Sequence, residues 1–283
     1  MISLGIMQGR LTPSKNRGIQ FFPFDMWENE FEIGCKLDIN EIEWIFDYDR
    51  FEENPIWTLE GIKRIKNSIG NTGIRVRSVC FDYFMRRPFY KYSREEAQKI
   101  KKENMEFIKK LISNMKEINA ELLEIPFVDN SSINNPYEEE QVIEFLYDVS
   151  NLADQADVLV GCETDLPVGA FYTFLQKIDG RVIRANYDSG NSSGLGYDHR
   201  DEILSLSEYI ANVHIKDRVF QGTTVQLGTG SADFEKVFSA LKDIKYEKSI
   251  VLQAARGKEG DEENTISKQV IFVREYCKKY GLV

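Results

Sequence analysis

The sequence predicts an α/β protein, a single-domain (β/α)8 TIM barrel that spans residues 1–283. Short β-rich runs alternate with longer segments of helical periodicity, and eight such β-then-α units follow one another. No linker, low-complexity stretch or change of composition interrupts them. Eight units in 283 residues fit a closed barrel of parallel strands better than an open doubly wound sheet.

The strands are predicted where apolar and β-branched residues cluster into short runs. The run 74–81 is the plainest example, since it contains the β-branched residues Ile74, Val76 and Val79. In chain order the predicted strands cover residues 2–7, 41–46, 74–81, 122–127, 158–164, 182–188, 211–217 and 249–254.

A helix follows each strand, and three of the helices begin with a recognisable signal. Thr58 is an N-cap candidate, and Ser93 with Glu96 makes a capping box. Pro167 suits the first turn of a helix. In chain order the predicted helices cover residues 26–36, 58–69, 93–118, 137–156, 167–178, 200–207, 233–241 and 262–280.

Composition and charge exclude several classes of protein. Hydrophobic residues make up 42% and charged residues 29%, which is typical of a large globular core and not of a disordered chain. The net charge of −10 repels phosphate backbones, so we expect no nucleic-acid partner. No apolar run approaches the ~18 residues of a membrane span, and the start lacks a signal-peptide pattern. We therefore expect no membrane partner and a cytoplasmic location.

Cysteine and histidine usage restricts the metal sites that the chain can build. The four cysteines lie far apart without a CxxC pair, so they indicate scattered thiols of a reducing compartment and not a zinc knuckle. His199 and His214 are the only histidines, so a site with three histidine ligands is excluded. His199 precedes a predicted helix in a polar loop, and we expect it at the surface.

In a (β/α)8 barrel the chemistry lies at the carboxyl ends of the strands. Four successive strands carry Glu163, Asp188, His214 and Gln253 there, and side-chain alternation allows all four to point into the barrel mouth. Two carboxylates, an imidazole and an amide could surround one divalent cation, with Mn²⁺, Co²⁺, Mg²⁺ and Zn²⁺ all open. The other polar residues near strand ends are Gln8, Arg10, Glu43, Asp82, Glu124, Asp129, Asp165, Asn186, Lys216, Asp217 and Arg256.

Four segments of the chain together resemble one family. They are residues 162–164 (CET), 186–191 (NYDSGN), 213–218 (VHIKDR), and 227–230 (LGTG) followed by Asp233 and Phe234. These segments resemble the sugar phosphate isomerase/epimerase superfamily of xylose-isomerase-like barrels. The resemblance spans nearly the whole chain, and the strand-seven segment with LGTG is its most specific part.

The resemblance implies the roles of the four candidate ligands. By position, Glu163, Asp188 and His214 match a glutamate, an aspartate and a histidine that bind one divalent metal in the family. The fourth family ligand is a glutamate that also acts as an acid or base, and here that position is Gln253. An amide can still ligate a metal, but it cannot accept a proton usefully near neutral pH. Asn191 stands where the family often has a histidine.

The resemblance implies a metal-dependent isomerase or epimerase that acts on a sugar, sugar phosphate or related polyol through an enediolate. Glu163 could be the single proton shuttle of an isomerase, with Gln253 as its neutral counterpart, or Glu124 or Lys216 could be a second base. Two alternatives stay open: a non-catalytic carbohydrate-binding barrel with a degenerate site, and an inosose-type dehydratase. The oligomeric state is open between a homodimer and a homotetramer.

Several further residues are substrate-binding candidates with a structural alternative. Arg10 and Arg256 could contact an anion or phosphate, or could form salt bridges at the rim. Asp217 could instead pair with Arg218 and hold a loop. The glycines of 227–230 could shape that loop or cradle a phosphate. The complete set of substrate-binding candidates is Arg10, Glu43, Glu124, Asn191, Lys216, Asp217 and Arg256.

Overall fold

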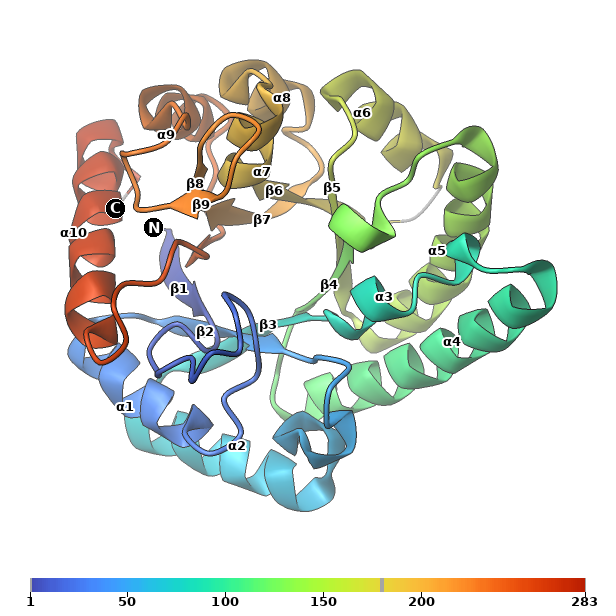
Figure 1. The fold of residues 1–283 in the computed structure, drawn as a ribbon, viewed down its shortest axis with the longest axis horizontal. Coiled ribbons are helices and arrows are strands. Elements are labelled where there is room, and N and C mark those ends of the chain that lie inside the picture. Colours follow the sequence, from blue (N-terminus) through green and yellow to red (C-terminus); the bar gives the residue numbers. More distant parts are fainter. Residues whose placement is uncertain (1, 179–180, 283) are drawn as a thin grey trace. The chain divides into compact units, whose positions relative to one another are not determined.

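The computed structural model describes residues 2–178 and 181–282. Its eight long strands pair in parallel and close into a barrel in the order β1-β10-β7-β6-β5-β4-β3-β2. Each predicted strand overlaps one of them, so the predicted fold class is confirmed. The strands are β1 Ser3–Met7, β2 Glu41–Ile45, β3 Arg75–Cys80, β4 Leu122–Phe127, β5 Leu159–Thr164, β6 Ile183–Asp188, β7 Ile210–Ile215 and β10 Ser249–Leu252 (Figure 1).

The helices follow the strands along the chain. Thr58 caps α2, because its Oγ1 accepts from the Gly61 N–H at 3.0 Å. Ser93 takes the N-cap position of α4 but makes no side-chain cap bond, and Pro167 lies one residue before α6. The helices are α1 Trp27–Lys36, α2 Leu59–Thr72, α3 Tyr83–Arg86, α4 Arg94–Glu117, α5 Pro136–Ala156, α6 Val168–Lys177, α7 Ser189–Leu195, α8 His199–Ser205, α9 Phe234–Asp243 and α10 Glu262–Tyr280.

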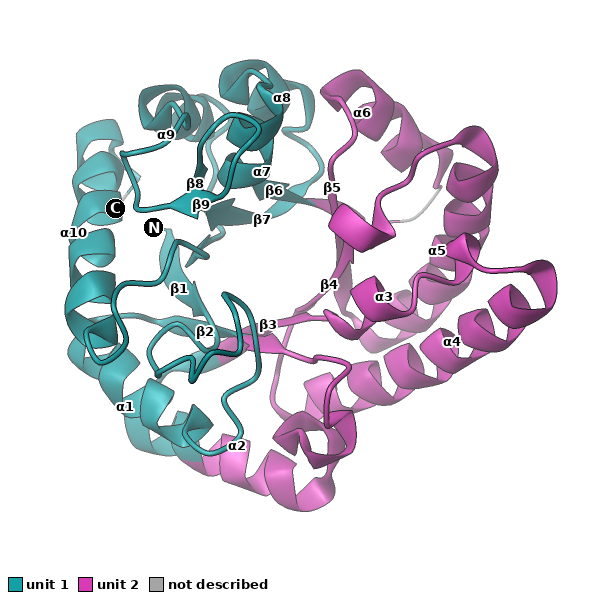
Figure 2. Ribbon diagram, in the orientation of Figure 1, with its two compact units in different colours: residues 1–43, 68–75, 186–283 teal, residues 44–67, 76–185 magenta. Residues whose placement is uncertain are grey.

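Contacts between residues divide the chain into two compact units (Figure 2). Unit 1 comprises Met1–Glu43, Ser68–Arg75 and Asn186–Val283, and unit 2 comprises Trp44–Asn67 and Val76–Ala185. The ends of the chain meet within unit 1, where the Ile2 N–H donates to the Leu282 carbonyl at 3.1 Å. That the whole chain is a single folding domain stays a prediction.

Polar side chains on neighbouring strands meet inside unit 1. On β2, Glu41 and Glu43 are buried on one face, while Ile42 is buried on the other. Glu41 accepts from the hydroxyl of Ser249 on β10. Gly5 of β1 pairs with both Glu41 and Val251, and a Cβ at Gly5 would lie 3.3 Å from the Val251 side chain. The absent side chain therefore leaves room for polar groups from the neighbouring strands.

The core of unit 2 is aromatic. Phe145 of α5 lies 5.7 Å from Phe84 of α3 and 5.1 Å from Phe89, and Phe84 lies 5.3 Å from Phe127 of β4, measured between ring centroids. All four rings are at most 1% exposed. Burial of this much apolar surface fixes α3 and α5 against β4.

Several elements of the described chain were not predicted, among them β8, β9 and α7. The strand expected at 211–217 ends at Ile215, and Asp217–Arg218 (β8) instead pairs antiparallel with Thr224–Val225 (β9). Helix α7 has the sequence SGNSSGL, which is poor in helix-forming residues. It forms because Asp188 Oδ1 accepts from the N–H groups of Gly190 at 2.7 Å and Asn191 at 2.8 Å, and because most of the helix is buried. Cap and burial thus outweigh intrinsic propensity.

In the part of the chain that the structure describes, no helix is both long and apolar enough to cross a membrane.

Candidate active site

The carboxylate of Glu43 holds the ring of His214 on β7 in place. Its Nε2 lies 2.7 Å from Glu43 Oε1, and the second Glu43 oxygen accepts from the Asn212 amide at 2.9 Å. The side chains of His214 and Glu43 are fully buried. A carboxylate is an acceptor, so Nε2 carries the proton and Nδ1 is the ring nitrogen available to a cation. Glu43, a predicted substrate-binding residue, lies where a carboxylate orients a histidine ligand.

The Nδ1 side of His214 faces Asp188. The distance from Nδ1 to Asp188 Oδ2 is 3.9 Å, which is too long for a hydrogen bond. Two ligands that each lie about 2.1 Å from one metal ion are separated by roughly 3–4 Å, so both side chains could bind the same cation. The Asn186 amide nitrogen lies 3.2 Å from Nδ1 and 3.5 Å from Nε2. Because Nε2 donates to Glu43, the amide donates to Nδ1 in this structure.

Asp188 ends β6 and serves two purposes. Its Oδ1 caps α7, and its Oδ2 accepts from the Lys216 ammonium at 3.1 Å. Burial opposes ionisation, but the charge of Lys216 and the hydrogen bonds from Lys216 and the Asn191 N–H hold the pKa of Asp188 below its ordinary value. Asp188 is therefore an anion, the form in which a carboxyl group binds a metal.

Gln253 follows β10 and is buried, with 5% of its surface exposed. Its Oε1 accepts from Lys216 Nζ at 3.1 Å, and its Nε2 donates to Gln20 Oε1 at 3.2 Å. Lys216 also donates to Asn191 Oδ1 at 3.2 Å. The structure therefore brings Asp188, Asn191 and Gln253 together around one ammonium group.

Arg10 and Arg256 hold a loop in place. Arg10 donates to the carbonyls of Ala254, at 3.1 Å, and Ile19. Arg256 donates to three carbonyls of the loop that follows β1: Thr12 at 2.9 Å, Ile19 at 3.1 Å, and Gly9. The contact with a substrate anion that we predicted for both residues stays a prediction.

Glu30 of α1 also holds the loop that follows β1, through hydrogen bonds. Its carboxylate accepts from the N–H groups of Gly9 at 2.9 Å and Leu11 at 3.0 Å, and from the Thr12 hydroxyl at 3.2 Å. Burial raises the pKa of Glu30 to about 7. No feature of the sequence marked Glu30, because its partners lie some twenty residues away and two of the three bind through their backbones.

Asp217 organises the segment 227–232. It is fully buried, and it accepts from the N–H groups of Gly228 at 2.9 Å, Gly230 at 2.8 Å and Ala232 at 3.0 Å. A Cβ at Gly230 would lie 2.3 Å from the Asp217 carboxylate, so only glycine fits there. The N–H groups of Gly228 and Gly230, which could otherwise bind a phosphate, donate to Asp217 in this structure. Asp217 thus holds this loop through backbone N–H groups, whereas Arg218, its predicted partner, donates to the Gly222 carbonyl at 3.0 Å.

In unit 2, Glu124 of β4 and Glu163 of β5 lie on one face of the paired strands. Glu124 is opposite Gly161 and Pro126 is opposite Glu163 in the register. Glu124 is fully buried and Glu163 is 4% exposed. Beyond the strand end, Asp165 accepts from the Ser132 hydroxyl, and burial raises the pKa of Asp165.

The structure contradicts the prediction that His199 lies at the surface. His199 is 3% exposed, and its Nδ1 lies 2.8 Å from the hydroxyl of Tyr187. Burial lowers the pKa of His199 and raises that of Tyr187. The missed signal is Tyr187 itself, because a buried phenol needs a hydrogen-bond partner.

We expect Glu202→Gln to flatten the pH dependence of stability. Burial raises the pKa of Glu202 to about 7 from an ordinary 4.5. The folded protein therefore binds this proton more tightly than the unfolded chain, and stability falls as the pH rises from 4.5 through 7, by about 3 kcal/mol for this group. Urea unfolding at pH 5 and pH 8 should show a smaller loss in the variant. An equal loss in both proteins would contradict this account.

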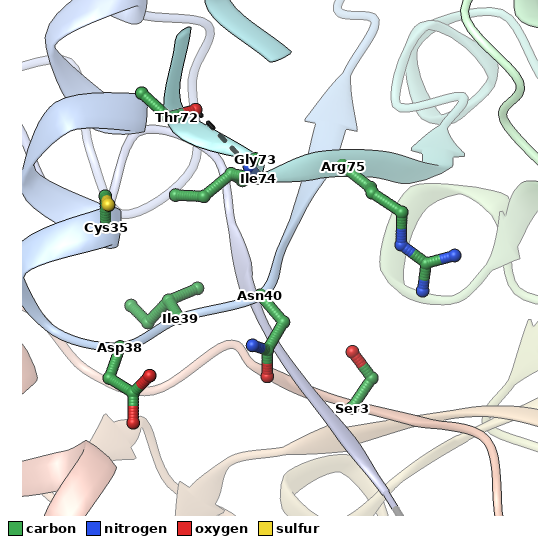
Figure 3. Close-up of a pocket in the computed structure, with 9 residues that line it drawn as sticks. All are labelled: Ser3, Cys35, Asp38, Ile39, Asn40, Thr72, Gly73, Ile74 and Arg75. Atoms are coloured by element: carbon green, nitrogen blue, oxygen red, sulfur yellow. Dashed lines mark hydrogen bonds between the residues drawn. The ribbon is translucent and has the colours of Figure 1, made fainter. Parts of the chain in front are cut away.

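A separate cavity of about 440 Å³ opens in unit 1 (Figure 3). It lies at the amino ends of β1, β2 and β3, the end of a barrel that carries no catalytic residues. Its lining residues are Ser3, Cys35, Asp38, Ile39, Asn40, Thr72, Gly73, Ile74 and Arg75.

Comparison with known proteins identifies the family. Residues 36–276 match the xylose isomerase-like TIM barrel family. L-ribulose-5-phosphate 3-epimerase UlaE of Escherichia coli strain SMS-3-5 is 23% identical over 276 residues, which cover 92% of this chain and 93% of that protein.

Solved structures show the same fold. A structure of L-ribulose 3-epimerase superposes with a TM-score of 0.76 at 14% identity, covering 99% of this chain and 96% of that one. D-psicose 3-epimerase from Clostridium cellulolyticum H10 gives 0.74 at 13% identity, covering 99% of each chain. The IOLI protein, whose structure holds a zinc atom, gives 0.74 at 15% identity over 99% of each chain. The chain belongs to the xylose isomerase-like TIM barrel family.

Proposed function

We propose that this protein is a divalent-metal-dependent isomerase or epimerase of a small sugar, sugar phosphate or related polyol. The observation that carries the proposal is the pair His214 and Asp188, which face each other at 3.9 Å with Glu43 behind the histidine. The match to sugar epimerases over 92% of the chain supports it.

The proposed ligands are Glu163, Asp188 and His214, with Gln253 as a neutral fourth. Two carboxylates and an imidazole are a set that can hold a divalent ion, with Mn²⁺, Co²⁺, Mg²⁺ and Zn²⁺ all suitable. A bound cation would polarise the carbonyl and the neighbouring hydroxyl of the substrate, which acidifies the proton between them. Glu163 then takes that proton as a general base.

The amide at Gln253 favours a reaction with one base. Gln253 cannot accept a proton near neutral pH. Lys216 lies 3.1 Å from its Oε1, but its Nζ also donates to Asp188 and so is not placed to accept a proton from a substrate. Return of the proton by Glu163 to the adjacent carbon is isomerisation, which needs no second base. Glu124 is the remaining candidate for the second base of an epimerase.

The direct test is exchange of substrate protons with deuterated solvent. The purified protein is loaded with Mn²⁺ and incubated with ketoses and their phosphates in D₂O, and label is followed by proton NMR. We expect deuterium at the carbon next to the carbonyl of at least one sugar, with an isomer or epimer as product. Loss of water would instead identify an inosose-type dehydratase.

A non-catalytic carbohydrate-binding barrel is the second candidate. It is favoured by the saturated hydrogen bonding of Gln253, whose oxygen and nitrogen already bind Lys216 and Gln20. This candidate predicts that sugars bind without any solvent exchange. Size-exclusion chromatography with light scattering tests the proposed homodimer or homotetramer, and localisation in the cytoplasm stays a prediction.

A further inference from the structure

Lys216 contacts two of the four proposed metal ligands, Asp188 and Gln253. We propose that its ammonium group competes with the divalent cation for Asp188 and Gln253, and thereby sets how tightly that cation binds. The inference rests on the proposed function, since it concerns the same site.

The ammonium is fully coordinated. Lys216 Nζ lies 3.1 Å from Asp188 Oδ2, 3.1 Å from Gln253 Oε1 and 3.2 Å from Asn191 Oδ1. An ammonium has three N–H donors, so three acceptors satisfy it. Its side chain is only 15% exposed. Lys216 is therefore a bound cation in a site made of oxygen atoms.

Contacts with the neighbouring backbone fix the conformation of the Lys216 side chain. The Lys216 N–H donates to Ser189 Oγ at 3.0 Å, which ties β7 to the start of α7. A Cβ at Gly190 would lie 2.4 Å from Lys216 Cγ and 2.9 Å from its Cδ. The stem of the lysine thus packs directly on the backbone of Gly190, and the ammonium is aimed at Asp188 Oδ2.

The two cations need the same oxygen. Asp188 Oδ1 is engaged by the N–H groups of Gly190 and Asn191, which leaves Oδ2 for a metal ion. Lys216 occupies Oδ2, and it also occupies the amide oxygen of Gln253. Two positive charges within a few ångströms repel strongly in a buried site. The divalent ion must therefore displace the ammonium from Oδ2.

The neutral amide of Gln253 favours binding of the Lys216 ammonium over binding of a divalent cation. Among the three side chains that meet at the ammonium, the charges of Asp188 and Lys216 cancel, and Gln253 adds none. A glutamate at this position would add one negative charge, which favours a divalent ion over a monovalent one. The neutral residue at the end of β10 and the nearby ammonium thus act in the same direction, toward weak metal binding.

Titration of each protein with Mn²⁺ tests the competition. The free ion is measured by its electron paramagnetic resonance signal. The proteins are the wild type, Lys216→Met, Lys216→Gln and Lys216→Arg. We expect Lys216→Met and Lys216→Gln to bind Mn²⁺ at least about tenfold more tightly, because a competing positive charge is removed. Lys216→Arg keeps the charge and should not tighten binding. Circular dichroism confirms that each variant is folded, and Lys216→Gln keeps a donor toward Asp188 should the methionine variant unfold.

Each outcome decides between the two proposals. Tighter binding in the neutral variants alone supports the competition. Equal or weaker binding in folded neutral variants, with a wild type that binds Mn²⁺, overturns the competition and leaves the proposed function standing. Absence of Mn²⁺ binding in all four proteins overturns the metal site, and the competition with it.

Discussion

Glu163→Gln should lower solvent exchange at the substrate carbon by roughly 10²–10⁴-fold, the range that a general base contributes. Glu163 is 4% exposed on β5, and it is the carboxylate that we assign to both metal binding and proton transfer. The amide has nearly the same shape and can still ligate a metal, but it cannot take the proton. The measurement is deuterium incorporation by proton NMR with Mn²⁺ at saturation.

Asp165→Asn is the matched control. Asp165 lies two residues after Glu163, just beyond the end of β5. Its carboxylate accepts a hydrogen bond from the Ser132 hydroxyl. The control variant should exchange at close to the wild-type rate. If Glu163→Gln still exchanged protons normally, Glu163 would be a ligand at most, and the proton-transfer role would be wrong.

His214→Ala should weaken divalent-metal binding by more than about 100-fold, since it removes a direct ligand where loss of a supporting group alone costs 10–100-fold. The same change leaves Glu43 buried without its ring partner, so we also expect a loss of about 3 kcal/mol in the free energy of unfolding. Mn²⁺ titration and urea unfolding measure the two effects separately.

Two variants separate metal binding from stability. His214→Gln places an amide donor near Glu43 and should recover part of the stability, but not the metal affinity. His199→Gln removes the other histidine, which bonds Tyr187 at 2.8 Å, and should leave the metal affinity unchanged. An unaltered affinity in folded His214→Ala would refute the ligand assignment.

Alternation of strands and helices was enough to predict the barrel. Side-chain alternation also predicted that Asn212, His214 and Lys216 share one face of a strand. Asn212 and His214 do, since both contact Glu43, but Lys216 lies beyond the strand, which ends at Ile215. These features follow from local sequence, since each is fixed by a period of two or by the length of a run.

Contacts between residues that are far apart in the chain could not be predicted from the sequence. Glu43 and His214 are 171 positions apart, so nothing local shows that the carboxylate orients the ring. Asp217 was predicted to bind substrate, yet its carboxylate is bound by N–H groups that only the folded loop brings near. Helix α7 was missed because Asp188 caps a segment of poor helix propensity.

Anomalous diffraction from crystals grown with Mn²⁺ tests the central claim most directly. The claim is that one cation binds to Glu163, Asp188 and His214. We expect a single strong peak within about 2.0–2.3 Å of a Glu163 oxygen, Asp188 Oδ2 and His214 Nδ1, with the Lys216 ammonium moved away from Oδ2. Crystals with saturating Mn²⁺ but no peak beside His214, or a peak at another group of residues, would contradict it.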